Sequence, residues 1–148
     1  MNKLECFAYF GITLKNIRWS WSGINKSGKN RKDILGDGKE GVAAFTLWTD
    51  QLRWDKENKC SLWSIFNAEN HLWREAKGNI ERIENLKYCL ENLNGEFRPI
   101  FVEPKKPGVI DETREAKRHY LKNDKDFWYR ITSFDEVTGE CEAQSFIK

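Results

Sequence analysis

Alternation between apolar and polar positions dominates the chain and predicts strands as its main elements. Successive side chains of a strand face opposite sides, so a half-buried strand repeats every two residues. A polar break at residues 55–59 divides one alternating run into a hairpin, and Thr138 with Gly139 marks the turn of a second. Pro99 interrupts another run, part of which is therefore expected at a sheet edge or a bulge. The predicted strands cover residues 4–10, 16–24, 42–50, 52–66, 96–104, 126–135 and 136–147.

Two segments carry helical patterns instead. Residues 79–95 form the stronger one, because their apolar positions have helical spacing and Gly95 follows as a cap glycine would. The apolar stripe consists of Ile83, Leu86, Leu90 and Leu93. Residues 111–121 place acidic side chains first and basic ones later, which suits the helix dipole and predicts a short helix.

The order of these elements predicts the fold class. Runs of strands, rather than a strict alternation of strand and helix, are typical of α+β folds with mostly antiparallel pairing. We expect a single domain over residues 1–148, with a curved sheet or partly closed barrel, one long packed helix and one short helix. The glycine-rich polar stretch at residues 25–41 predicts a long loop, of a kind that often carries function.

Composition indicates a globular protein of the cytoplasm. Charged residues make up 32% of the chain and hydrophobic residues 39%. No apolar run approaches the ~20 residues of a membrane helix, and the N-terminus lacks a signal-peptide pattern, so no membrane partner is expected. The four cysteines are spread widely without a Cys-x-x-Cys pair, which predicts buried hydrophobic residues. Neither a metal nor a cofactor is expected.

No complete catalytic motif occurs in the sequence, which favours a binding module over an enzyme. A Mg²⁺-dependent nuclease is one alternative, since such enzymes hold the metal with carboxylates and position water with the lysine of a Glu-x-Lys arrangement. Glu57 and Lys59, after Asp50, have that chemistry, and so do Glu103 and Lys105. Both segments fall in predicted turns, where charged side chains are ordinarily solvated.

Seven tryptophans are an unusual number for 148 residues. Trp19 and Trp21 are one residue apart in a predicted strand and therefore face the same side. Trp48 and Trp54 lie on neighbouring predicted strands, and Asp50 ends the first of these. Indole rings allow a base to stack, and a carboxylate accepts hydrogen bonds from its exocyclic amine. These five residues are the predicted base-binding site, with a core role for Trp19 and Trp21 as the alternative.

The net charge of +2 and the pI near 8.3 make the position of cations more informative than their sum. Cations bind nucleic acid by displacing counterions from phosphates. The predicted phosphate contacts lie beside the first tryptophan pair and in the long loop: Arg18, Lys26, Lys29, Arg31 and Lys32. A second basic group consists of Arg114, Lys117, Arg118, Lys122 and Lys125.

Three segments resemble a known type of domain: FGITLKNIRWSWSGI, VAAFTLWTDQL and NIERIENLKYCLENLNGEFRPIFVEP. They resemble the small N-terminal domains found beside HNH nucleases in modification-dependent restriction proteins, which are similar to PUA-like modules such as EVE and ASCH domains. The resemblance covers residues 8–104 and is carried by the WSW stretch, the LWTD strand and the helix opening at Glu81 and Arg82. It implies a barrel-like sheet with a pocket for a flipped modified base, held by Trp19, Trp21, Trp48 and Asp50.

We therefore expect a non-catalytic module that binds nucleic acid, DNA rather than RNA, and reads a modified or flipped base. No HNH segment occurs in the sequence, so the expected setting is a freestanding reader or regulator in restriction-modification or phage defence. The first alternative is a phage or mobile-element protein that inhibits a bacterial defence protein, since exposed Trp and Arg are common at protein interfaces. The second is the Mg²⁺-dependent nuclease.

Overall fold

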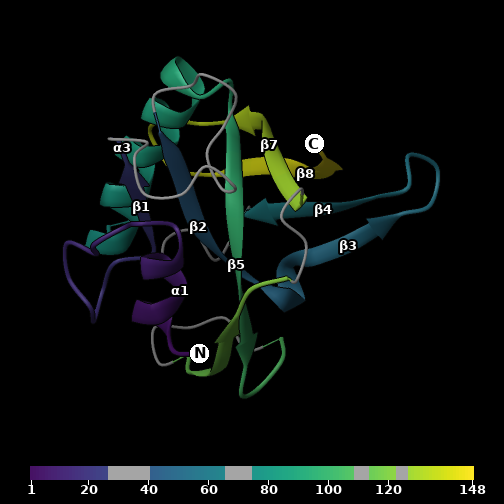
Figure 1. Cartoon of the computed structure of the whole chain (residues 1–148). Coiled ribbons are helices and arrows are strands. Elements are labelled where there is room, and N and C mark those ends of the chain that lie inside the picture. Colours follow the sequence, from purple (N-terminus) through teal and green to yellow (C-terminus); the bar gives the residue numbers. More distant parts are fainter. Residues whose placement is uncertain (27–40, 66–74, 109–113, 123–126) are drawn as a thin grey trace.

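The computed structural model describes residues 1–26, 41–65, 75–108, 114–122 and 127–148 (Figure 1). In chain order its elements are α1 (Lys3–Tyr9), β1 (Ser22–Asn25), β2 (Val42–Trp48), the 3-10 helix η1 (Thr49–Gln51), β3 (Leu52–Asp55), β4 (Cys60–Ile65), α3 (Lys77–Asn92), β5 (Glu96–Pro104), β6 (Ala116–Tyr120), β7 (Phe127–Phe134) and β8 (Cys141–Ile147).

Eight strands form one sheet in the order β1-β2-β5-β7-β8-β4-β3, and β6 pairs with β5 beside this path. β2 and β5 run parallel, and every other pair is antiparallel. The predicted α+β class is confirmed, with a mostly antiparallel sheet, a long helix α3 and a short helix α1. Across the described strands the sheet is open, ending at β1 and β3, and is not a closed barrel (Figure 1).

Both faces of β2 are buried, which explains its nearly continuous apolar run. Phe45 and Leu47 enter the cluster beneath α3, whereas Val42 and Ala44 enter the cluster beneath α1. A strand covered on both faces loses the polar half of its alternation. The helices complete these clusters with Leu86, Cys89 and Leu93 from α3 and with Cys6 and Phe7 from α1.

The strand predicted over residues 4–10 is wrong, because this segment forms α1. Asn2 caps the helix: its Oδ1 accepts from the Glu5 N–H at 2.8 Å, and its own N–H donates to the Glu5 carboxylate at 3.4 Å. This reciprocal capping box satisfies amide groups that a first helical turn leaves unpaired. Phe7 and Phe10, three residues apart, are buried on one face of the turn.

The short helix predicted over residues 111–121 is also wrong. Residues 111–113 lie outside the described residues, and Ala116–Tyr120 form the strand β6. In the register with β5, Tyr120 lies opposite Phe101, and their rings stack with centroids 5.4 Å apart. Pairing along β5 therefore outweighs the weak helical preference that the order of charges suggested.

β5 is not an edge strand, because it pairs with β2, β6 and β7, but its register with β6 shifts between Glu103 and Pro104, so an irregularity occurs near the end of this run and not at Pro99. The antiparallel partner changes along β5: β7 lies opposite residues 96–97, and β6 lies opposite residues 101–104. Pro99 lies in the gap between these partners. Because proline cannot donate to a ladder, a position between two partners accommodates it inside a sheet.

Several other predictions can be compared with the structure. The long helix, the β3–β4 hairpin and the β7–β8 hairpin are confirmed. All four cysteines are buried and free, as expected. The predicted loop falls mainly on residues 27–40, outside the described residues, together with Lys29, Arg31 and Lys32. None of the helices described is both long and apolar enough to cross a membrane.

Candidate functional site

Trp19 and Trp21 do not share a strand. A turn covers residues 17–19, and β1 begins only at Ser22, so the strand predicted over residues 16–24 is wrong in its first two thirds. The half-buried Trp21 ring packs on α3, where the guanidinium carbon of Arg82 lies 5.0 Å from the ring centroid. The Trp21 carbonyl accepts from the Thr46 N–H at 3.0 Å and the Thr46 hydroxyl at 3.1 Å. Both the ring and the backbone carbonyl of Trp21 thus make contacts within the protein.

Gly78 makes the close approach of Trp21 to α3 possible. A methyl group on Gly78 would lie 2.5 Å from the Trp19 carbonyl oxygen and 2.5 Å from Cδ2 of Trp21. Real side chains do not approach this closely, so a larger residue must push the helix and the tryptophan segment apart.

Gly78→Ala is expected to destabilise the protein by about 1–3 kcal/mol, although alanine is the better helix former by about 1 kcal/mol. The measurement is the free energy of unfolding in a urea titration. Lys77→Ala, one residue earlier on an exposed position, is the control and should change that free energy by less than about 0.5 kcal/mol. A stabilised Gly78→Ala variant would contradict the tight packing of Trp21 on α3.

Trp48 and Asp50 lie together, and Arg114 joins them. The guanidinium carbon of Arg114 lies 4.1 Å from the centroid of the Trp48 ring. The Asp50 carboxylate accepts from Arg114 Nη2 and, at 2.9 Å, from the Gly108 N–H. Asp50 is exposed as a residue, yet its side chain is only 17% exposed and that of Arg114 only 8%. The carboxylate predicted to bind a base is therefore already occupied by an arginine.

The remaining predicted residues lie elsewhere. Trp54 is on β3 and is 62% exposed. Arg18 is exposed in the turn before β1, where its N–H donates to Asn16 Oδ1 at 2.9 Å. Lys26 follows β1, with its Nζ 4.9 Å from the centroid of the Tyr88 ring. Of the residues predicted to hold a base, the structure thus places Trp48 beside Asp50, whereas Trp19 and Trp21 lie in the segment before β1 and Trp54 lies on β3.

Of the second basic group, Lys117 and Arg118 lie on β6, Arg114 precedes the strand and Lys122 follows it, while Lys125 lies outside the described residues. Between residues 103 and 122, the described positions include six lysines or arginines and two glutamates, an excess of four positive charges. The exposed positions among these cations are Lys105, Lys106, Lys117, Arg118 and Lys122. Because the whole chain carries only +2, positive charge is concentrated at this edge of the sheet. We call these five residues the β6 basic edge.

Two carboxylates lie within the β6 basic edge and are paired with its cations. Glu103 accepts from Arg118 at 2.6 Å and lies 3.5 Å from Lys117, and Glu115 lies 2.8 Å from Lys105. The hydrogen bond from Arg118 lowers the pKa of Glu103, and that from Lys105 lowers the pKa of Glu115. Both acids stay ionised at neutral pH and offset part of the positive charge.

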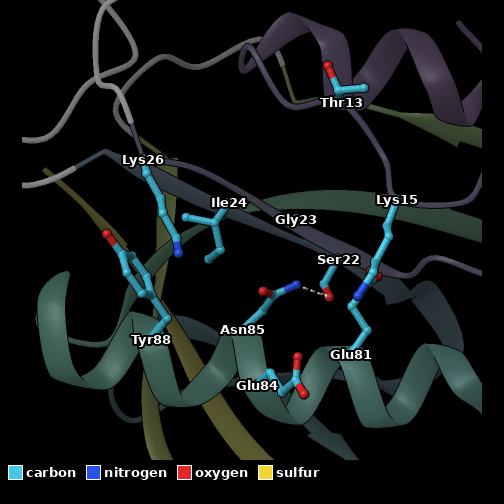
Figure 2. A pocket seen from close by; sticks show the side chains of 10 residues that line it. All are labelled: Thr13, Lys15, Ser22, Gly23, Ile24, Lys26, Glu81, Glu84, Asn85 and Tyr88. Atoms are coloured by element: carbon cyan, nitrogen blue, oxygen red, sulfur yellow. Dashed lines mark hydrogen bonds between the residues drawn. The ribbon is translucent and has the colours of Figure 1, made fainter.

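A groove of about 330 Å³, which the sequence did not predict, lies between β1 and α3 (Figure 2). It is lined by Thr13, Lys15, Ser22, Gly23, Ile24, Lys26, Glu81, Glu84, Asn85 and Tyr88. Lys26 is the one predicted site residue in this lining. The helix supplies residues 81, 84, 85 and 88, whose spacing puts them on one face. This polar stripe, opposite the apolar one, was the signal in the sequence that could have indicated the groove.

The residues considered for a nuclease are not grouped as metal ligands in the described part of the chain. Asp50 is held by Arg114 and Glu103 by Arg118, while Glu57 is exposed in the turn that Asp55 closes. Among the residues described, no three His, Cys, Asp or Glu side chains are close enough to hold a metal ion together.

The chain matches no family model, no curated protein and no solved structure. The resemblance to PUA-like modules therefore stays a prediction.

Proposed function

We propose that this protein is a nucleic-acid-binding module that holds the phosphates of DNA along the β6 basic edge. The observation that supports this proposal most strongly is the concentration of exposed cations on β6 and in the segments that flank it, in a nearly neutral protein. Lysine and arginine gain affinity for DNA by releasing condensed counterions, so clustered cations bind phosphates far better than scattered ones.

The geometry of β6 suits a phosphate backbone. Lys105 and Lys106 follow β5, Lys117 and Arg118 lie on β6, and Lys122 comes after β6. Lys122 lies 4.1 Å from the Phe127 ring centroid, and Arg118 lies 4.5 Å from that of Tyr120, so aromatic faces support two of them. Lys117 and Arg118 are adjacent on β6 and both contact the Glu103 carboxylate, so their charged groups lie close together and can bind neighbouring phosphates.

The base-reading part of the proposal involves the aromatic residues beside this edge. Arg114 lies two residues before β6 and contacts both Trp48 and Asp50, so this cluster adjoins the basic edge. A flipped base would stack on Trp48 and meet Asp50 only by displacing Arg114, which could itself turn to a phosphate. Trp54, which is largely exposed, offers a second stacking surface.

The test is fluorescence anisotropy with short labelled oligonucleotides: duplex DNA, single-stranded DNA and RNA of one sequence. We expect binding of DNA with a dissociation constant of about 10⁻⁶–10⁻⁴ M at physiological salt, the range of sequence-independent binding. A base modification recognised by the site should tighten this value. No binding of any of these nucleic acids at low salt would contradict the proposal.

Glu103→Gln should tighten the binding of duplex DNA about threefold at low salt. The substitution removes the carboxylate that holds Arg118 and Lys117, so both cations become available to phosphates. Glu140→Gln is the control, because it changes the net charge equally at the β7–β8 turn. Equal effects of the two variants in the anisotropy assay would show that total charge, and not the β6 basic edge, sets the affinity.

A further inference from the structure

The groove between β1 and α3 lies along the outer edge of β1 (Figure 2). α3 forms one wall, and the segment that follows α1 forms the other with Thr13 and Lys15. Gly23 lets that segment lie against β1, since a methyl group there would be 2.3 Å from Cγ2 of Ile12. Backbone of a strand is therefore accessible between two walls that carry side chains.

The backbone of β1 points donors and acceptors into this groove. The Thr46 N–H donates to the Trp21 carbonyl, so these two residues form a hydrogen-bonded pair in the register of β1 and β2. Such pairs alternate along antiparallel strands, so Gly23 pairs toward β2, whereas Ser22 and Ile24 direct their N–H and C=O groups outward. No strand in the described residues pairs with that side of β1.

The α3 wall carries acceptors at the end of the groove nearest Ser22. Glu81 and Glu84 lie there, one turn apart on the helix. The Glu81 Oε1 atom is buried, and no donor among the described residues reaches it. Burial raises the pKa of Glu81, against a hydrogen bond from Ser20 and the charge of Lys15, which reaches toward Glu81 in Figure 2. A buried carboxylate oxygen without a donor favours a ligand that supplies one.

The other end of the groove is more apolar. Ile24 and Tyr88 line it, and the Lys26 side chain lies beside the Tyr88 ring. The side chain of Ser22 faces α3, because its hydroxyl accepts from Asn85 Nδ2 at 2.8 Å. Ile24, two residues on, faces the same side, so residues of an added strand opposite Ser22 and Ile24 would also point toward α3.

We propose that the groove binds an extended peptide segment of a partner protein as an additional antiparallel strand on β1. A lysine or arginine opposite Ser22 reaches Glu81 and Glu84, and an apolar residue two positions earlier packs on Ile24 and Tyr88. Backbone hydrogen bonds supply affinity in this mode, and the wall of α3 supplies the sequence preference. This site is separate from the β6 basic edge, so the protein has a surface for a protein partner as well as one for nucleic acid.

The test begins with a phage-displayed library of random heptapeptides selected on the intact protein. We expect enrichment of sequences with an apolar residue two positions before a lysine or arginine. The best sequence is then synthesised in two forms, N-methylated either at the basic residue or at the residue between the two. Methylation at the basic residue blocks an N–H that donates to Ser22 and should weaken binding at least tenfold. The N–H of the middle residue points away from β1, so methylation there should leave the affinity within about twofold.

Glu81→Gln tests the charge. It should weaken binding of the selected peptide about tenfold. The affinity of the same peptide with norleucine in place of its basic residue should stay unchanged, whereas a loss of folding would weaken both. Lack of enrichment, equal binding of the two N-methylated peptides, or displacement of the peptide by duplex DNA would overturn the proposal. Self-association of the chain would also overturn the proposal if Ile24→Pro abolished it, because β1 would then pair with a second copy.

Discussion

The triple substitution Lys106→Glu, Lys117→Glu and Lys122→Glu is expected to weaken the binding of duplex DNA by at least about 100-fold at low salt. All three side chains are exposed on the β6 basic edge, so the change should leave the core intact. Each lost phosphate contact makes the slope of log K against log salt concentration less steep by about 0.9. For three lost contacts the change should be about 2.7. Anisotropy at several salt concentrations measures both quantities, and circular dichroism checks the fold.

A matched variant separates the position of the cations from their number. Arg53→Glu, Lys56→Glu and Lys59→Glu change the net charge equally on the β3–β4 hairpin, whose turn projects away from the sheet in Figure 1. This control should lose less than about fivefold in affinity, because only the long-range field of the protein changes. If both variants lose the same affinity, the β6 basic edge is not the binding surface.

Trp21→Ala is expected to lower the free energy of unfolding by about 2–4 kcal/mol. The ring fills the space against Gly78 and lies on Arg82, whose burial lowers its pKa to about 10. Arg82 still carries its charge at neutral pH, and without the indole that buried cation loses an aromatic neighbour. Urea denaturation measures the loss, and DNA affinity of the folded variant should stay within about threefold of the unsubstituted protein.

Trp54→Ala is the control for this substitution, because Trp54 is 62% exposed and its removal should change stability by less than about 0.5 kcal/mol. A different outcome would favour the base-binding site expected from the sequence. If Trp21→Ala keeps its stability and loses tenfold or more in DNA affinity, Trp21 stacks on a base and not on α3.

Local patterns predicted those elements whose buried face is set by their own residues. α3 was predicted because its apolar stripe repeats at helical spacing over four turns, and Leu86 and Leu93 from that stripe are buried. The two hairpins were predicted because polar turns separate their arms. In both cases the local preference agrees with the tertiary environment, so sequence reasoning succeeds.

α1 and β6 were missed because each has a short, ambiguous pattern. Over seven residues, apolar positions such as Phe7 and Phe10 fit a strand or a helix, and the capping pair Asn2 and Glu5 carried the deciding signal. β6 is highly charged and gains its strand conformation from pairing with β5. No pattern within residues 116–120 indicates that they pair with β5.

The site was only partly predictable, since its contacts join distant residues. Arg114 donates a hydrogen bond to Asp50 although the two residues are 64 positions apart in the sequence, and no local spacing indicates that pair. The second basic group was noticed in the sequence, but its arrangement along an edge strand follows from the pairing of β5 with β6. The groove depends on which backbone groups of β1 face outward, which only the register with β2 defines.

The salt dependence of DNA binding by the unsubstituted protein tests the central claim most directly. If the five exposed cations of the β6 basic edge contact phosphates, log K should fall linearly with log salt, with a slope between about −3 and −4.5. A slope near zero, or no binding at low salt, would contradict the account.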